Sequence, residues 1–162
     1  MADSAEIKLE EVNQDKWYLI HDALLRSTSL EWINRNEEDL FFIAGVIRDH
    51  TQLKNMTIEF RLDGEHEKAI NDLGLAVQSS KARQLCIRRD THLRQPIADG
   101  PQGVNINKFL KSLQHSHNLK ELDIAFHPKP HDHEGIGCAI QNQQLVRFTI
   151  SPSISYRSCG HT

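Results

Sequence analysis

The sequence predicts an α/β fold in which repeated helix–strand units align their strands in one parallel sheet. The first observation is a template, apolar-x-x-apolar-x-Ile, that recurs along the chain. The second is an amphipathic helical stripe that precedes the copies at a regular distance. A single unit has no partner for its apolar face, so we expect the units to stack, with helices covering one side of the sheet. The clear copies of the template are Leu53/Met56/Ile58, Ala82/Leu85/Ile87, Leu119/Leu122/Ile124 and Leu145/Phe148/Ile150.

Composition gives the third observation. The chain has 162 residues, of which 25% are charged and 38% hydrophobic, as in a soluble folded domain. A formal charge of −3 argues against a nucleic-acid-binding protein. The longest apolar run, Leu40–Ile47, is too short to cross a bilayer, and the acidic stretch 1–12 lacks the apolar centre of a secretory signal. Cys86, Cys138 and Cys159 are odd in number and irregularly spaced, which speaks against a disulfide framework. We therefore expect a cytoplasmic protein that contacts neither nucleic acid nor a membrane.

The N-terminal part, 1–36, is expected to form an irregular repeat or cap. A partial copy of the template ends at Ile7 and Leu9, and a helix should follow around Leu24. The next strand is a weaker copy, with Leu30 in the first slot, Ile33 in the second and Arg35 in the last. We expect three aromatic residues of this region to cover the open end of the stack: Trp17, Tyr18 and Trp32.

The core repeats should occupy 37–150, followed by a polar tail at 151–162, within a single domain spanning 1–162. The first slots of successive copies are separated by 26, 23, 29, 37 and 26 residues, about 28 on average. Glycine- and proline-containing loops fall between a strand and the next helix, at Asp63–Gly64, Pro96–Gly103 and His127–Gly135. The longest interval contains Thr91–Gly103, which we interpret as an inserted surface loop. Six residues before the first slot of the last five copies lie Leu24, Ile47, Ala76, Leu113 and Ala139.

On these segments the chain resembles leucine-rich-repeat proteins of the ribonuclease-inhibitor-like class, and in particular the C-terminal repeats of NOD-like receptors. The likeness is carried by "FIAGVIRDHTQLKNMTI" (42–58) and "FLKSLQHSHNLKELDI" (109–124). It implies a short solenoid of about five to six irregular repeats, with a curved parallel sheet inside and helices outside. The Asn or Cys that usually follows the strand in these repeats is replaced here by Arg61, Asp90, His127 and Ser153.

The candidate functional surface is the concave face of the sheet. Strand residues that point away from the helices form a broad surface suited to a protein partner. Their charges are mixed, which favours a polar, charge-patterned contact with a protein over a hydrophobic ligand pocket. Its predicted contact residues are Thr57, Glu59, Cys86, Arg88, Glu121, Asp123, Arg147 and Thr149.

Two alternatives remain open beside this interaction module. One is a metal-binding protein that uses the loop from His127 to Cys138, with His127, His131, His133 and Glu134 as ligands. The other is a fragment of an innate-immune-type sensor whose repeats once followed a signalling domain. No catalytic constellation can be assembled from the sequence, so neither an enzyme nor a cofactor is predicted. Parallel sheets with open ends expose edge strands, so dimerisation through the ends of the solenoid is a further expectation.

Overall fold

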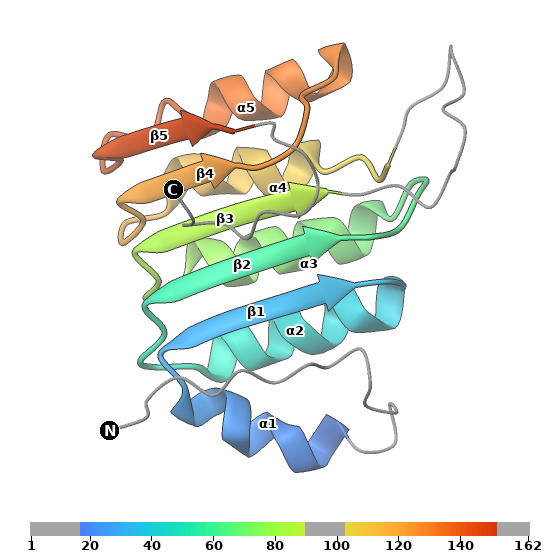
Figure 1. The fold of residues 1–162 in the computed structure, drawn as a ribbon, viewed down its shortest axis with the longest axis vertical. Coiled ribbons are helices and arrows are strands. Elements are labelled where there is room, and N and C mark those ends of the chain that lie inside the picture. The colour runs from blue at the N-terminus through green and yellow to red at the C-terminus, as the bar shows by residue number, and fades with distance from the viewer. Residues whose placement is uncertain (1–16, 90–102, 152–162) are drawn as a thin grey trace.

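The computed structural model describes residues 17–89 and 103–151, and in these ranges helices and strands alternate (Figure 1). Five strands are joined by connections that contain the helices and the short 3-10 segments η3 and η4. The elements in chain order are α1 (Trp17–Arg26), β1 (Ser29–Asn34), α2 (Glu37–Asp49), β2 (Asn55–Phe60), α3 (Glu67–Gln78), β3 (Gln84–Arg89), α4 (Asn107–Ser112), η3 (Leu113–His115), β4 (Glu121–Ile124), η4 (Pro130–Asp132), α5 (His133–Ala139) and β5 (Arg147–Ile150).

The strands form one parallel sheet in the order β1-β2-β3-β4-β5, so each strand lies beside its neighbour in the sequence. Helices α2 to α5 lie behind the sheet in Figure 1, on one face of it. The template residues Ile58, Ile87, Ile124 and Ile150 are paired in register across β2 to β5. The predicted α/β class, with a parallel sheet alternating with helices, is therefore confirmed.

The core lies between the helices and the covered face of the sheet. Alternate strand residues enter it, because successive side chains of a strand point to opposite faces. Ile58, Ile87 and Ile124 are all completely buried. Burying such a side chain stabilises the fold by roughly 1.5–3 kcal/mol. The helices add their own close contacts: a Cβ placed on Gly74 of α3 would lie 3.1 Å from the Phe109 Cα of α4.

The register of the first strand differs from the prediction. Leu30 pairs with Met56 and Trp32 with Ile58, so Trp32, and not Arg35, fills the last slot of the template. The predicted alignment was wrong by three residues. Its cause is the turn between α1 and β1, which has two residues (27–28), whereas the turns before β2, β3 and β4 have five (50–54, 79–83 and 116–120).

Trp32 is consequently a core residue of the first strand. Its side chain is 1% exposed and stacks on Phe42 of α2, with 5.3 Å between ring centroids. The indole Nε1 donates a hydrogen bond to the Asn34 Oδ1, and the Asn34 Nδ2 donates to the Glu59 backbone oxygen of β2. Trp32 thus joins β1 to both α2 and β2.

Each helix-to-strand turn contains one buried polar residue, and we call this set the turn residues. The backbone N–H of each donates to the carbonyl three residues earlier, which ends the preceding helix. Their side chains satisfy further backbone groups: the Ser80 Oγ donates to the Val77 oxygen, and the Asn142 Nδ2 donates to the Leu113 and Ser116 oxygens. The turn residues are Ser27, His50, Ser80, Ser116 and Asn142.

Some sequence predictions fall outside the described residues. These are the partial unit at Ile7 and Leu9, most of the inserted loop Thr91–Gly103, and the polar tail beyond 151. The backbone of Trp17 and Tyr18 belongs to α1, but their side chains are not described. The predicted break at Asp63–Gly64 is present, and Gly64 has a φ of 90°, a conformation that favours glycine. Within the described ranges, every helix is too short or too polar to span a bilayer.

Candidate interaction surface

The face of the sheet opposite the helices, which we call the sheet face, carries side chains in rows that cross the strands. Parallel pairing in register places Glu31, Thr57, Cys86, Asp123 and Thr149 in one row. A second row, one step closer to where the strands begin, contains Ser29, Asn55, Gln84, Glu121 and Arg147. Strand geometry spaces neighbours within a row about 4.8 Å apart. All eight residues predicted from the sequence lie on this face.

Hydrogen bonds link the side chains of neighbouring strands on the sheet face. Asp123 is the best connected: its Oδ1 accepts from the Thr149 Oγ1 at 2.8 Å and from the Ser151 Oγ at 2.7 Å. Glu121 accepts from the Gln84 Nε2 on one side and from the Arg147 Nη1, at 3.3 Å, on the other. These contacts fix the directions of the polar groups, so the surface presents a defined pattern of donors and acceptors.

Two of the predicted contact residues are buried. Glu59 is 3% exposed and Cys86 is 7% exposed, in contrast with the expected surface positions. Glu59 is held between two guanidinium groups, since its Oε1 lies 3.5 Å from the Arg88 Nη1 and its Oε2 accepts from the Arg61 Nε. Because Glu59 is buried and is held by both guanidinium groups, we assign it a structural role in positioning Arg88.

Cys86 also bears on the expectation that the cysteines form no disulfide framework. The structure places it in a disulfide, and its Sγ lies 3.8 Å from the Asp123 Oδ2. Cys138, in α5, is free. The parity of the cysteine count could not reveal this, because an odd number still permits one bridge.

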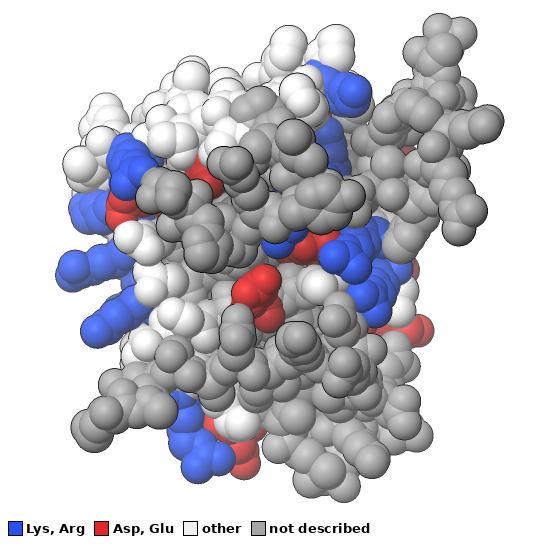
Figure 2. All heavy atoms as spheres, in the orientation of Figure 1, with Lys and Arg blue, Asp and Glu red and all other residues white. Residues whose placement is uncertain are grey.

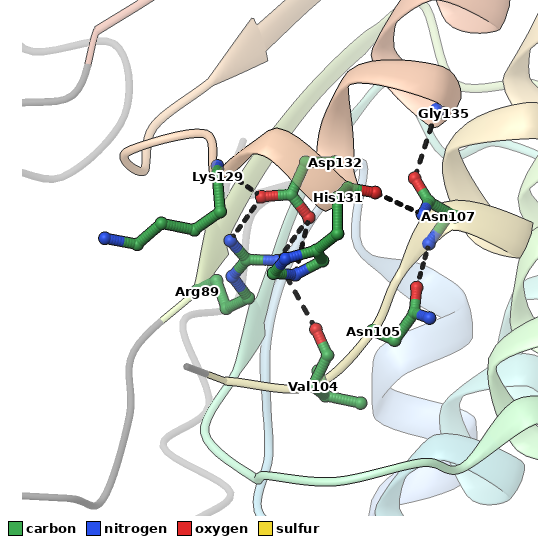
Figure 3. A network of polar contacts seen from close by, with 8 residues as sticks. All are labelled: Arg89, Val104, Asn105, Asn107, Lys129, His131, Asp132 and Gly135. Atoms are coloured by element: carbon green, nitrogen blue, oxygen red, sulfur yellow. Dashed lines mark hydrogen bonds and ion pairs between the residues drawn. The ribbon is translucent and has the colours of Figure 1, made fainter. Parts of the chain in front are cut away.

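The segment from His127 to Cys138, which we call the histidine loop, contains a buried ion-pair network (Figure 3). Asp132, the last residue of η4, is completely buried and forms a bidentate salt bridge with Arg89 of β3. The Arg89 Nη1 donates to the Asp132 Oδ1 at 2.8 Å, and the Nη2 donates to the Oδ2 at 2.6 Å. The guanidinium also lies over the Phe126 ring, 4.4 Å from its centroid. The loop is thereby fastened to the end of β3.

Further hydrogen bonds hold the backbone around this pair. The Lys129 N–H donates to the Asp132 Oδ2 at 2.8 Å. Asn107, at the start of α4, donates from its Nδ2 to the His131 oxygen at 2.5 Å and accepts from the Gly135 N–H at 3.0 Å. A side chain at Gly135 would collide with this amide, since its Cβ would lie 2.5 Å from the Asn107 Oδ1. The network joins β3, α4 and α5 (Figure 3).

The electrostatics of Asp132 follow from this arrangement. Burial by itself raises the pKa of a carboxyl group. The hydrogen bonds from Arg89 and from the Lys129 N–H, together with the positive charge of Arg89, outweigh burial and hold the pKa of Asp132 below its ordinary value. Asp132 is therefore a permanent anion at neutral pH.

The proposed metal ligands do not come together. Among the described residues no cluster of three or more His, Cys, Asp or Glu side chains could hold a metal ion. His131 lies against Asp132, with 3.4 Å between its Nε2 and the Asp132 Oδ1, whereas His127 and His133 are exposed. Glu134 instead pairs with Lys111 at 2.6 Å, and the hydrogen bond from Lys111 lowers the pKa of Glu134. The described residues therefore do not support the metal-binding alternative.

A second surface, missed at the sequence level, lies where the strands begin. Lys54, Arg83 and Lys120 each directly precede a strand and follow the first apolar slot of the template. The Lys54 oxygen accepts from the Arg83 N–H at 2.8 Å, and the Arg83 oxygen accepts from the Lys120 N–H at 2.8 Å, so the three residues are direct neighbours. Figure 2 shows Lys and Arg side chains gathered along this edge, on the left of the view. The signal was present in the aligned copies, in which the residue directly after the first slot is Lys, Arg, Lys and Val.

Comparisons with known proteins add no identification: no model of a known protein family matches the sequence, and no curated protein is significantly similar to it.

Proposed function

We propose that the chain is a short leucine-rich-repeat solenoid that acts as a non-enzymatic interaction module and binds a protein partner through the sheet face. The observation that carries this proposal is the in-register row of polar side chains on a face that no helix of the described residues covers. The core uses only the opposite face of the strands, so folding alone does not require ordered donors and acceptors here. The template and its helix–strand units support assignment to the repeat class.

The chemistry of the sheet face suits a protein better than a small apolar ligand. Neutral, negative and positive groups follow one another along it, as in Gln84, Glu121 and Arg147 across three strands. Fixed polar groups of both signs give specificity and orientation in protein–protein contacts. Arg88 adds a cation whose side chain is 18% exposed and is oriented by Glu59. We propose Thr57, Arg88, Glu121, Asp123, Arg147 and Thr149 as the contact set.

The test is site-specific photo-crosslinking in cells that express the protein. A photoreactive residue replaces Glu31, which is exposed on the sheet face, and in a matched variant it replaces Leu75, which is 50% exposed on α3. We expect a discrete protein adduct from position 31 and none from position 75. Mass spectrometry then identifies the adduct. Identical adducts from both positions, or adducts from position 75 alone, would contradict the proposed surface.

We further propose a cytoplasmic location, which rests on the composition of the chain. The disulfide at Cys86 makes this proposal testable, because cytosolic thiols are kept reduced. Alkylation of freshly lysed cells, followed by mass spectrometry of the peptide containing Cys86, should find an alkylated thiol if the location is correct. A fully oxidised Cys86 would point to an oxidising compartment.

A further inference from the structure

Among the described residues, the edge where the strands begin carries an excess of positive charge. The helix-to-strand turns at 27–28, 50–54, 79–83, 116–120 and 140–146 contain four basic residues and no acidic residue. We define the basic rim as these four residues together with Arg147, which opens β5 and is paired with Glu121: Lys54, Lys81, Arg83, Lys120 and Arg147. Lys54, Lys81, Arg83 and Arg147 are exposed, and Lys120 is half-buried.

The basic rim is a row and not a scatter of charges. Lys54, Arg83 and Lys120 follow one another across β2, β3 and β4, about 4.8 Å apart by strand geometry. Like charges directly opposite each other on neighbouring strands destabilise a sheet. Within the described residues, neither Lys54 nor Arg83 has an ion-pair partner, and the Lys120 Nζ is held by the neutral Gln144 Oε1 at 3.0 Å. Among the residues that the structure describes, this repulsion between the three cations is therefore not neutralised by an acidic side chain.

The dipoles of the helices do not account for this row. Cations are favourable in the last turn of a helix, and the effect decays within that turn. Lys54, Arg83 and Lys120 each lie five residues beyond the end of the preceding helical segment. A position required for solubility alone would not need to repeat in register in three units.

We propose that the basic rim binds an extended acidic peptide segment of a protein partner. Alternate side chains of an extended peptide point the same way at intervals of about 6.6–7 Å, and flexible Lys and Arg side chains can bridge the difference from the strand spacing. The row continues into Val146, which is 81% exposed and whose N–H donates to the Lys120 oxygen. The bound peptide would thus place its carboxylates along the starts of β2 to β4. Its apolar side chain, at one end, would contact Val146.

A protein segment fits these features better than a nucleic acid does. The row of three cations ends on an exposed valine, the next cation, Arg147, is already paired with Glu121, and the whole chain has a charge of −3. This inference deepens the proposed function by naming the chemistry of the partner, and it rests on that function for its biological meaning. Its test is separate, because crosslinking from position 31 reports on the sheet face and the titration below reports on the basic rim.

The experiment is a fluorescence-anisotropy titration of the whole chain with a labelled peptide in which glutamate alternates with serine and a leucine ends the segment. We expect Lys54→Glu combined with Arg83→Glu to weaken binding by about tenfold or more, because two attractive contacts become repulsive. The matched control reverses two charges on the helices, Lys68→Glu and Lys108→Glu, and should leave the affinity within about twofold. Circular dichroism of both variants checks that they are folded.

Two further arms decide the class of ligand. Val146→Ser should remove the preference for the leucine-ended peptide over an otherwise equal peptide that ends in serine. A single-stranded oligonucleotide of equal charge should bind more weakly than the peptide at the same salt concentration. The inference is overturned if the oligonucleotide binds more tightly, if the helix-side control loses as much affinity as the basic-rim variant, or if the acidic peptide does not bind the unmodified chain.

Discussion

Asp132 shows how a single residue can fasten a loop to the sheet. It is completely buried, and the pair it forms with Arg89 joins residues that are 43 positions apart in the sequence. Removing one partner of a buried pair is costly because the other is left charged without compensation. The pair therefore acts as a single unit whose members cannot be changed one at a time.

We expect Asp132→Asn to lower the free energy of unfolding at pH 7 by about 3–5 kcal/mol, because Arg89 would remain buried without its anion. Urea denaturation followed by circular dichroism measures this change. Glu134→Gln is the control: it makes the same chemical change two residues away, in an exposed ion pair, and should have little effect. Equal losses in the two variants would show that burial of the pair is not the cause.

The same residue gives a pH prediction. The pKa of Asp132 is held below its unfolded value, so the carboxylate contributes stability above about pH 3.9 and loses it as the pH falls through the folded pKa. The difference in stability between the unmodified chain and Asp132→Asn should shrink in that acidic range. Unfolding measured from pH 7 to pH 2 would test this. A difference that stays constant would contradict a charged Asp132.

His50 should produce a second pH effect, at higher pH. Its Nδ1 accepts a hydrogen bond from the Gln52 N–H, and burial lowers its pKa, although the backbone of Leu24 and Ser27 opposes part of this effect. The folded state thus resists protonation, so stability should fall as the pH drops below about 6.5, where unfolded histidine gains a proton.

We expect His50→Gln to flatten the dependence of stability on pH between about 6.5 and 5. Thermal unfolding at several pH values would measure it, with His115→Gln, at an exposed position, as the control. A variant that retains the full slope would assign the effect to another histidine.

The network around Asp132 illustrates why the sequence misled at this scale. The closely spaced His131 and His133 suggested metal ligands, whereas the buried Asp132 between them holds the loop in place. Its partner Arg89 ends β3, and nothing local in the sequence connects the two residues. Pairing of this kind depends on the three-dimensional path of the chain, which spacing alone does not encode.

At the scale of elements, the apolar template predicted β2 to β5 with their register, because buried positions must alternate in a strand that has one covered face. The predicted register of the first strand was wrong by three residues. The template assumed a constant distance from helix to strand, whereas the turn after α1 is shorter. Trp32 gave a usable signal, since a large aromatic residue in a strand-like segment is suited to a core slot. The helical stripe was correctly placed at Leu24 despite this error.

Contact between α3 and α4 depends on Gly74. A Cβ at this position would lie 2.6 Å from the Ser112 Oγ and 3.1 Å from the Phe109 Cα. We expect Gly74→Ala to destabilise the protein by about 1–3 kcal/mol, because overpacking outweighs the gain in helix propensity. Gly45→Ala, in α2, provides the matched control: no atom lies within 4 Å of its Cβ, and it should stabilise the protein by about 0.5–1 kcal/mol. Denaturant unfolding of both variants measures the free energy of unfolding, which should fall for Gly74→Ala and rise for Gly45→Ala.

At the scale of the whole molecule, the units are arranged in a line and each packs against its immediate neighbours. Contacts between helices link α1 to α2, α2 to α3, α3 to α4 and α4 to α5. The last unit has one neighbour within the described residues, and its strand shows this: Ile150 is 44% exposed, whereas the equivalent Ile87 is completely buried. The expected dimerisation through the ends remains a prediction that this exposed strand makes testable by sedimentation.

We expect Ile87→Ala to cost about 2–5 kcal/mol, because it creates a cavity between two neighbours. The same substitution at Ile150, in the equivalent slot, should cost clearly less. Amide hydrogen exchange should agree, with faster exchange in β5 than in β2 and β3. Equal costs and equal protection would mean that the end of the sheet is covered in solution, as a dimer would cover it.

Polar side chains in the helix-to-strand turns determine the direction in which such a molecule can be extended. The Asn142 side chain donates hydrogen bonds to the carbonyls of Leu113 and Ser116, and the Asn118 side chain donates to that of Ser80, so each of the last two modules carries an asparagine that binds it to the module before. A duplicated gene segment would therefore encode its own asparagine for contact with the module before it. Lengthening the array by copying at its C-terminal side would then require no redesign of the modules already in place.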